Sequence, residues 1–262
     1  MEEFKHAAAH WLCTDSGHTF EEVYAKVLSV TGEARRRYND DDVSLAAVSD
    51  AEFATMMFLD GCFLVWFIAG TSDDMVDDTL ARRCYHSSGP NIFKDMFLLE
   101  NQIPWVVLEA LMEFRPLMNM DSWIHACVVI LFYREKKKQE DTTVETSILD
   151  DSKPPHLLGL LRSSMIGSMP SQKRRGEAGE TSPWILPKGA MFLSQIGVKS
   201  TASRAEWFAN MNVQEKLVSG ELSLSPKVLG HFNACRLVNM AALEATGAFA
   251  TSRVEPEWDG GF

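Results

Sequence analysis

Three aspartates at helical spacing come nearest to a catalytic pattern in this chain. Asp73, Asp74 and Asp77 lie in the run Asp73-Asp-Met-Val-Asp77, which Asp78 extends. Residues four positions apart share one face of a helix, so Asp73 and Asp77 would present their carboxylates together. Carboxylate oxygens are ligands that Mg²⁺ prefers, and the ion could in turn bridge the oxygens of a diphosphate. The spacing is therefore compatible with a Mg²⁺-dependent enzyme.

A second metal motif would distinguish such an enzyme. The aspartate run matches the Asp-Asp-x-x-Asp pattern of terpenoid and prenyl-diphosphate enzymes, which are all-helical and resemble one another in a second motif that ends in glutamate. Here the nearest trace of that motif is Asp40-Asp41 with Ser44, and Val48 stands where the glutamate belongs. A hydrated acidic segment after a buried helix is the favoured interpretation, and Mg²⁺-dependent diphosphate chemistry at the aspartate run is the alternative.

A second possible metal site lies near the start of the chain. His6, His10 and Cys13 stand at i, i+4 and i+7, where one helix could bring them to a single metal ion. A fourth ligand is not evident nearby, and His10 could simply flank the core-facing Trp11. The sequence also lacks a nucleophile elbow, a phosphate-binding loop and a dinucleotide fingerprint. We therefore assign no catalytic, cofactor-binding or metal-binding residue, and we expect a protein that is not an enzyme.

A polar triplet interrupts the apolar run Leu98-Leu-Glu-Asn-Gln-Ile-Pro104. Glu100, Asn101 and Gln102 could form a polar site, but such residues more often satisfy the free backbone groups at helix ends. Pro104 has a fixed φ and no N–H, so it should end the preceding element and open a new helix. Apolar residues then recur at helical spacing, which predicts a core-facing helix. They are Ile103, Val107, Leu108, Leu111 and Met112.

Composition limits the possible classes of protein. The 262 residues are 46% hydrophobic, enough to bury one large core or two small ones. A net charge of -11 argues against a nucleic-acid-binding surface. The cysteines are odd in number and widely spaced, which favours reduced, mostly buried thiols in a cytosolic setting. They are Cys13, Cys62, Cys84, Cys127 and Cys235.

No signal peptide or membrane span is expected. The N-terminal run Met-Glu-Glu-Phe-Lys-His is polar, unlike a signal sequence. The most apolar segment, 54–69, is interrupted by Asp60 and Gly61, whereas a span needs about 20 predominantly apolar residues. The sequence therefore predicts a soluble chain.

Helical periodicity dominates the chain and should position these residues. Two helices are expected within residues 1–38, and Ser49 with Glu52 forms a capping box for a largely buried helix. Leu222 alternates with Leu224 after a Ser219-Gly220 turn, which predicts a hairpin at about 213–225. The remaining predicted helices lie at residues 104–112, 123–133, 156–162, 191–196 and 228–245.

The predicted fold is mainly α: a single helical domain over residues 1–245 with a small antiparallel β-hairpin in the last quarter. Two polar segments, at about 134–155 and 167–183, should be flexible linkers because they cannot bury enough apolar surface. Residues 246–262 are expected to form a frayed tail.

Several segments together resemble one known family. The signature Leu-Leu-Glu-Asn-Gln-Ile-Pro is similar to the central motif of a plant family known only as domain of unknown function 247. The other segments fall in the family's order and cover most of residues 1–244. They are the Glu-x-x-Lys start of the chain, the Asp60-Gly-Cys-Phe63 helix, the run His156-Leu-Leu-Gly-Leu160, Gly197-Val198, the Leu222 region and Asn239-Met-Ala-Ala-Leu-Glu244.

The resemblance implies a recognition or signalling role, since some grass members are implicated in self-incompatibility. It also implies an unknown protein partner. Relatives usually have an additional N-terminal segment and a C-terminal hydrophobic segment thought to reach the membrane. We therefore expect a truncated or divergent member, cytoplasmic or peripheral to the plasma membrane. Apolar Val65-Trp66-Phe67 also replaces a glutamate that is typical of the family.

Overall fold

The computed structural model describes eight stretches of the chain, which form mostly helices. Contacts divide the chain into two compact units. The first unit comprises residues 1–118, 155–159 and 230–262, and the second comprises residues 119–154 and 160–229. The mainly α prediction is confirmed, although the sequence predicted a single domain. The described residues are 1–38, 47–71, 79–132, 153–166, 190–202, 212–216, 219–224 and 231–246.

The first unit begins with two helices whose ends are set by local sequence. Helix α1 spans Glu2–Ser16 and ends at Gly17, whose φ of 71° is left-handed and suits a residue without a side chain. Helix α2 spans Phe20–Arg35 and starts with a capping box between Thr19 and Glu22. Both helices were expected, but the Thr19 capping box was missed.

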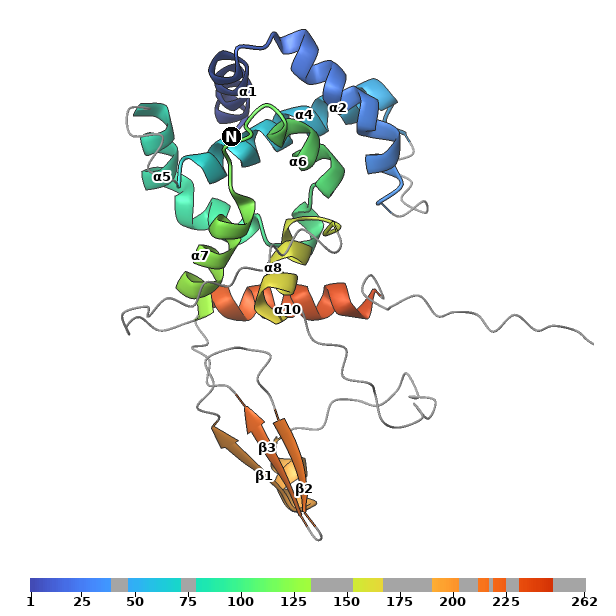
Figure 1. Ribbon diagram of the computed structural model, residues 1–262, viewed down its shortest axis with the longest axis vertical. Coiled ribbons are helices and arrows are strands. Elements are labelled where there is room, and N and C mark those ends of the chain that lie inside the picture. Colours follow the sequence, from blue (N-terminus) through green and yellow to red (C-terminus); the bar gives the residue numbers. More distant parts are fainter. Residues whose placement is uncertain are drawn as a thin grey trace, which may run out of the picture. The chain divides into compact units, whose positions relative to one another are not determined.

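Helix α4, Asp50–Ala69, forms the core of the first unit. It begins at the predicted capping box of Ser49 and Glu52 and is buried on nearly every side over its second half. Helices α1, α2 and α6 pack around it (Figure 1). At Gly61 a Cβ atom would lie 2.5 Å from Leu111 Cδ1, so any other residue here would force the Leu111 side chain of α6 to shift.

Four further elements complete the first unit. Helix α5, Thr79–Asp95, packs against α4 through stacked rings of Phe67 and Tyr85, 4.7 Å apart. The 3₁₀ turn η2, Leu99–Asn101, leads into helix α6, Trp105–Met112. Pro104 directly precedes α6, as the sequence predicted. Helix α10, His231–Ala245, packs on η2.

The buried face of α10 differs from the prediction. Helical spacing over residues 228–245 predicts that one face of this helix is buried, formed by Phe232, Cys235, Val238, Asn239 and Ala242. In the structure, however, Val238 is 68% exposed. Arg236, Met240 and Leu243 are buried instead. The guanidinium of Arg236 lies over the rings of Phe93 and Phe97, a cation–π arrangement that a hydrophobic pattern counts as polar surface.

The second unit combines helices with a small sheet. It contains helix α7, Met120–Phe132, most of helix α8, Leu157–Ile166, and helix α9, Ala190–Gln195. Strands β1, Val198–Ala202, and β2, Asn212–Lys216, flank β3, Ser219–Leu224 (Figure 1).

The predicted β structure, a small antiparallel hairpin, is wrong. The sheet has three strands, and β1 pairs with β3 in parallel, with Val198 opposite Gly220 and Ala202 opposite Leu224. Only the β2–β3 pair is antiparallel, and Ser219-Gly220, expected as a turn, belongs to β3. The pattern missed β1 because its side chains are mostly exposed and do not alternate cleanly.

Three predictions about chain mobility cannot be compared with the structure. The segment at 167–183, most of the segment at 134–155 and nearly all of the tail at 246–262 lie outside the described residues.

Candidate functional site

The sequence-predicted metal residues are not gathered into a site in the described part of the chain. The aspartate run, Asp73 to Asp78, lies outside it, as do Asp40, Asp41 and Ser44. His6 and His10 are exposed and Cys13 is partly buried. Among the described residues, no three His, Cys, Asp or Glu side chains lie close enough to hold a metal ion.

The polar triplet of the Leu98–Pro104 run joins three elements. The Gln102 side-chain amide donates from Nε2 to the carbonyls of Met96, at 3.0 Å, and Leu98, at 2.6 Å. Its Oε1 accepts a 2.8 Å hydrogen bond from the Leu158 N–H at the start of α8. The backbone carbonyl of Gln102 accepts a further hydrogen bond, at 3.1 Å, from the Tyr38 hydroxyl. Burial raises the pKa of Tyr38 to about 12, so this hydroxyl stays protonated.

Asn101 and Asn239 extend the same junction. Asn101 Nδ2 donates at 3.2 Å to the Asp95 carbonyl at the end of α5, which also accepts from the Leu98 N–H. Asn239 of α10 accepts from the Leu99 N–H at 2.8 Å and donates to the Cys235 carbonyl at 2.9 Å. Glu100 is exposed. The amide side chains therefore serve structural hydrogen bonds, the interpretation that the sequence favoured.

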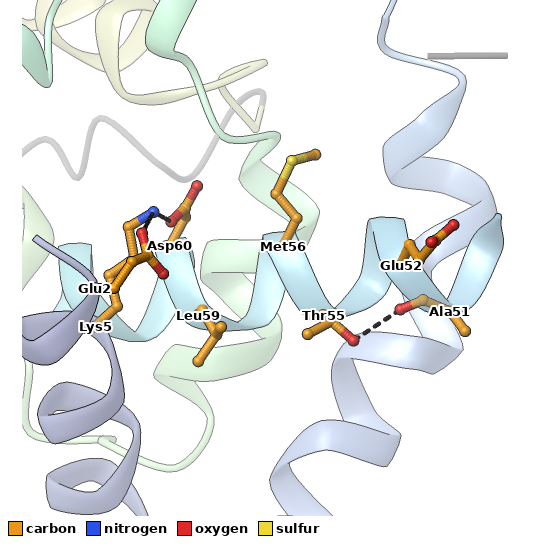
Figure 2. Close-up of a pocket in the computed structure, with 8 residues that line it drawn as sticks. All are labelled: Glu2, Lys5, Ala51, Glu52, Thr55, Met56, Leu59 and Asp60. Carbon is orange, nitrogen blue, oxygen red and sulfur yellow. Dashed lines mark hydrogen bonds and ion pairs between the residues drawn. The ribbon is translucent and has the colours of Figure 1, made fainter. Parts of the chain in front are cut away.

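A surface groove lies on α4 beside α1, and we call it the α1–α4 groove. It has a volume of about 450 Å³. Figure 2 shows the residues that line it. Thr55, Met56 and Leu59 of α4 supply its uncharged surface. Glu2 and Lys5 of α1 meet Asp60 at one end, and Ala51 and Glu52 lie at the other (Figure 2).

Lys5 is held between two carboxylates in this groove. Its Nζ lies 2.6 Å from Asp60 Oδ1 and 2.9 Å from Glu2 Oε1. Burial opposes the charge on Lys5, but the hydrogen bonds that Lys5 donates to Asp60 and Glu2 outweigh it and raise the Lys5 pKa. Lys5 in turn lowers the pKa of Glu2. The groove therefore contains a fixed ionic cluster that ties α1 to α4.

The other end of the groove is fixed by capping and by α2. The Glu52 carboxylate accepts two hydrogen bonds from Ser49, one from the Ser49 hydroxyl at 2.7 Å and one from the Ser49 N–H at 3.0 Å. Both hydrogen bonds lower the pKa of Glu52. From α2, the Tyr24 hydroxyl lies 3.2 Å from both the Ala51 carbonyl and the Thr55 hydroxyl. These contacts hold the charged and polar side chains of the groove in place.

A family comparison agrees with the motifs in this region. The family model DUF247, described as a plant protein of unknown function, matches residues 1–256. The chain belongs to this family. No curated protein and no solved structure matches the chain.

The structure brings together two segments by which the chain resembles DUF247. The Glu-x-x-Lys start contributes Glu2 and Lys5, and the Asp-Gly-Cys-Phe run contributes Asp60 to the same cluster. The next residue, Gly61, allows the close approach of α6. Sequence reasoning missed the cluster, although an aspartate within an apolar helix signals a charge that needs a partner.

The cysteines of this DUF247 chain are free thiols. Cys62, Cys84 and Cys127 are buried. Burial raises the pKa of Cys62 and of Cys84, so neither is a thiolate at neutral pH. The expectation of reduced, mostly buried cysteines agrees with this arrangement.

Helix α4 has the length and composition of a membrane-spanning helix. It is the one such helix among the described residues, and 61% of its most apolar window is buried inside the structure. A core helix of a globular unit meets the same criteria, so length and composition alone do not distinguish the two.

Proposed function

We propose that this chain is a non-catalytic recognition or signalling module whose α1–α4 groove contacts a partner protein. The observation that carries the proposal is an open groove in which apolar surface stands between fixed charges. Met56 is 42% exposed between the cluster of Lys5 with Asp60 and the capping carboxylate of Glu52. Such a surface offers shape and charge to a partner.

The bonding of the lining side chains supports a binding role over catalysis. A general base or nucleophile must reach a substrate proton or a reacting atom. In the groove, Lys5 is engaged by two carboxylates, and Glu52 is engaged by Ser49. The amides of Asn101 and Gln102 hold helix ends together.

The rival function is a Mg²⁺-dependent diphosphate enzyme that uses Asp73, Asp74 and Asp77. Its support is the spacing of these residues in the sequence. Calorimetric titration of the full chain with Mg²⁺ and geranyl diphosphate distinguishes the two functions. We expect only heat of dilution and no release of diphosphate. Micromolar binding that Asp74→Ala abolishes would overturn the proposal.

Capture from plant tissue tests the recognition role directly. The full chain should retain a reproducible set of proteins that Met56→Lys loses. Leu117→Lys is the matched control, since Leu117 is 93% exposed and lies outside the groove. Retention of the same proteins by both variants would show that the groove is not the recognition surface.

A further inference from the structure

The charges of the α1–α4 groove are unbalanced. Its four charged side chains are three carboxylates, Glu2, Glu52 and Asp60, and one ammonium, Lys5. Lys5 lies between Glu2 and Asp60, so its charge is already compensated within the groove. The excess is negative, and it lies on a chain whose net charge is -11. A cation entering the groove would therefore be attracted.

Two aromatic residues of α2 lie beyond the residues that line the groove. Tyr24 is tied to Thr55 in the groove, and its ring stacks on that of Phe20 at 6.0 Å. Phe20 is 50% exposed, and it also contacts the buried ring of Phe58 edge-on at 4.9 Å. Met56 supplies a flexible thioether that can adapt to different apolar partners. Aromatic anchors and an adaptable methionine are common at protein-binding surfaces.

We propose that the α1–α4 groove binds an amphipathic helix of a partner protein, with lysine or arginine beside an apolar face. This inference rests on the proposed recognition function. An apolar face would cover Met56 and Leu59, and its cationic residues would meet Glu2 and Glu52. Helix-in-groove recognition uses this division between apolar anchors and flanking charges.

Charge favours this occupant over a second copy of the chain. Two copies would each contribute a net charge of -11, and their groove carboxylates would face like charges. An acidic helix would meet the same repulsion. A cationic helix gains attraction at the rim while it covers the exposed apolar side chains.

Fluorescence anisotropy of the full 262-residue chain tests the occupant. The probe is a fluorescein-labelled helix of leucine and lysine, about four turns long. The matched control has the same leucines with glutamate in place of lysine. We expect the lysine peptide to bind at least about tenfold more tightly, and added salt to weaken its binding.

Paired variants test whether the lysine peptide binds in the α1–α4 groove. Met56→Lys and Glu2→Lys should each weaken binding of the lysine peptide by about tenfold. Leu117→Lys and Glu3→Lys introduce the same charge outside the groove and should change binding by less than about twofold. Unfolding curves of the variants establish that each is folded before binding is compared.

The outcomes separate the inference from the function on which it rests. Equal weakening by Glu2→Lys and Glu3→Lys would overturn the groove as the binding site, because the effect would follow net charge alone. Failure of the lysine peptide to bind would overturn the cationic helix as occupant. The recognition function itself is tested separately, by capture from plant tissue and by the calorimetric test for diphosphate binding through Asp74.

Discussion

At the scale of single residues, Asp60 shows how an isolated charge in an apolar helix can be explained by its partner. Its neighbours in the sequence give no cation, because Lys5 lies 55 positions earlier on another helix. Hydrophobic periodicity predicts that α4 is buried, and it also signals that Asp60 requires compensation. The cation that compensates Asp60 is determined by how α1 packs on α4, and the local sequence pattern around Asp60 does not specify that packing.

Replacing Lys5 should destabilise the first unit by leaving Asp60 without its cation. Lys5→Met keeps the length of the side chain and removes its charge, and we expect a loss of roughly 1–2 kcal/mol in the free energy of unfolding. The partial exposure of both side chains reduces the effect. Urea unfolding measures it. Glu2→Gln is the control, since Glu2 is more exposed, and an equal loss in both variants would contradict a specific role for the Asp60 pair.

Gln102 should contribute more to stability than its neighbour in the triplet. Gln102→Leu removes the side-chain hydrogen bonds with Met96, Leu98 and Leu158, so the Met96 carbonyl and the Leu158 N–H lose this partner, while the Leu98 carbonyl still accepts from the Asn101 N–H. We expect a loss of roughly 2–3 kcal/mol on urea unfolding. Exposed Glu100 provides the control, because Glu100→Gln should change stability by less than about 0.5 kcal/mol. Similar values for the two variants would show that the junction is misassigned.

At the scale of elements, the sequence predicts where helices begin and end better than it predicts which strands pair. Ser49 with Glu52 predicts the start of α4, and a glycine, Gly197, follows α9 with a φ of 84° that favours this residue type. The parallel pairing of β1 with β3 depends on residues about 20 positions apart, and no local turn specifies it. The face of α10 was misassigned because Arg236 is buried against aromatic rings.

Two glycines in helices should respond oppositely to alanine. At Gly61 a Cβ would press on Leu111 in the packed core, so Gly61→Ala should cost about 1–3 kcal/mol. At Gly32 in α2 no atom lies within 4 Å of a Cβ, so Gly32→Ala should stabilise by about 0.5–1 kcal/mol. Chemical unfolding measures both changes. Combining Gly61→Ala with Leu111→Ala should cost less than the sum of the single changes, and strict additivity would contradict the contact.

His156 should make the start of α8 sensitive to acid. Its Nδ1 accepts the Gly159 N–H at 3.2 Å, and burial lowers the His156 pKa to about 4. Above pH 6.5, the ordinary pKa of histidine, His156 is mostly neutral in both the folded and the unfolded chain. As pH falls from 6.5 towards 4, the unfolded chain binds a proton that the folded chain excludes, so stability decreases by up to about 3 kcal/mol.

The matched variant is His156→Asn, which retains an oxygen that can cap the helix and does not titrate. Denaturant unfolding between pH 7 and pH 4 should show a smaller loss of stability in His156→Asn than in the unchanged chain. His10→Asn, at an exposed position outside α8, is the control for replacing a histidine with asparagine. Parallel curves for all three proteins would exclude His156 as the titrating group.

At the scale of the whole molecule, membrane insertion of the chain through α4 would require this helix to leave the core of the first unit. The helix is apolar enough to span a bilayer, but it is surrounded by α1, α2 and α6, and the Lys5–Asp60 pair lies at its middle. Entry into a bilayer would require these helices to separate and a carboxylate to leave its cation. We therefore predict that α4 remains a core helix and that the chain has no spanning segment.

Alkaline carbonate extraction of a fluorescent fusion expressed in plant cells tests this last prediction. Carbonate should release the fusion from membranes into the supernatant, whether the chain is cytoplasmic or held peripherally through a partner. A control fusion with an added run of about 20 leucines and alanines should stay in the pellet. Retention of the unmodified fusion would mean that a segment of this chain enters the bilayer. Release of the variant Asp60→Leu as well would show that packing by the surrounding helices, rather than the charge of Asp60, keeps α4 out of the membrane.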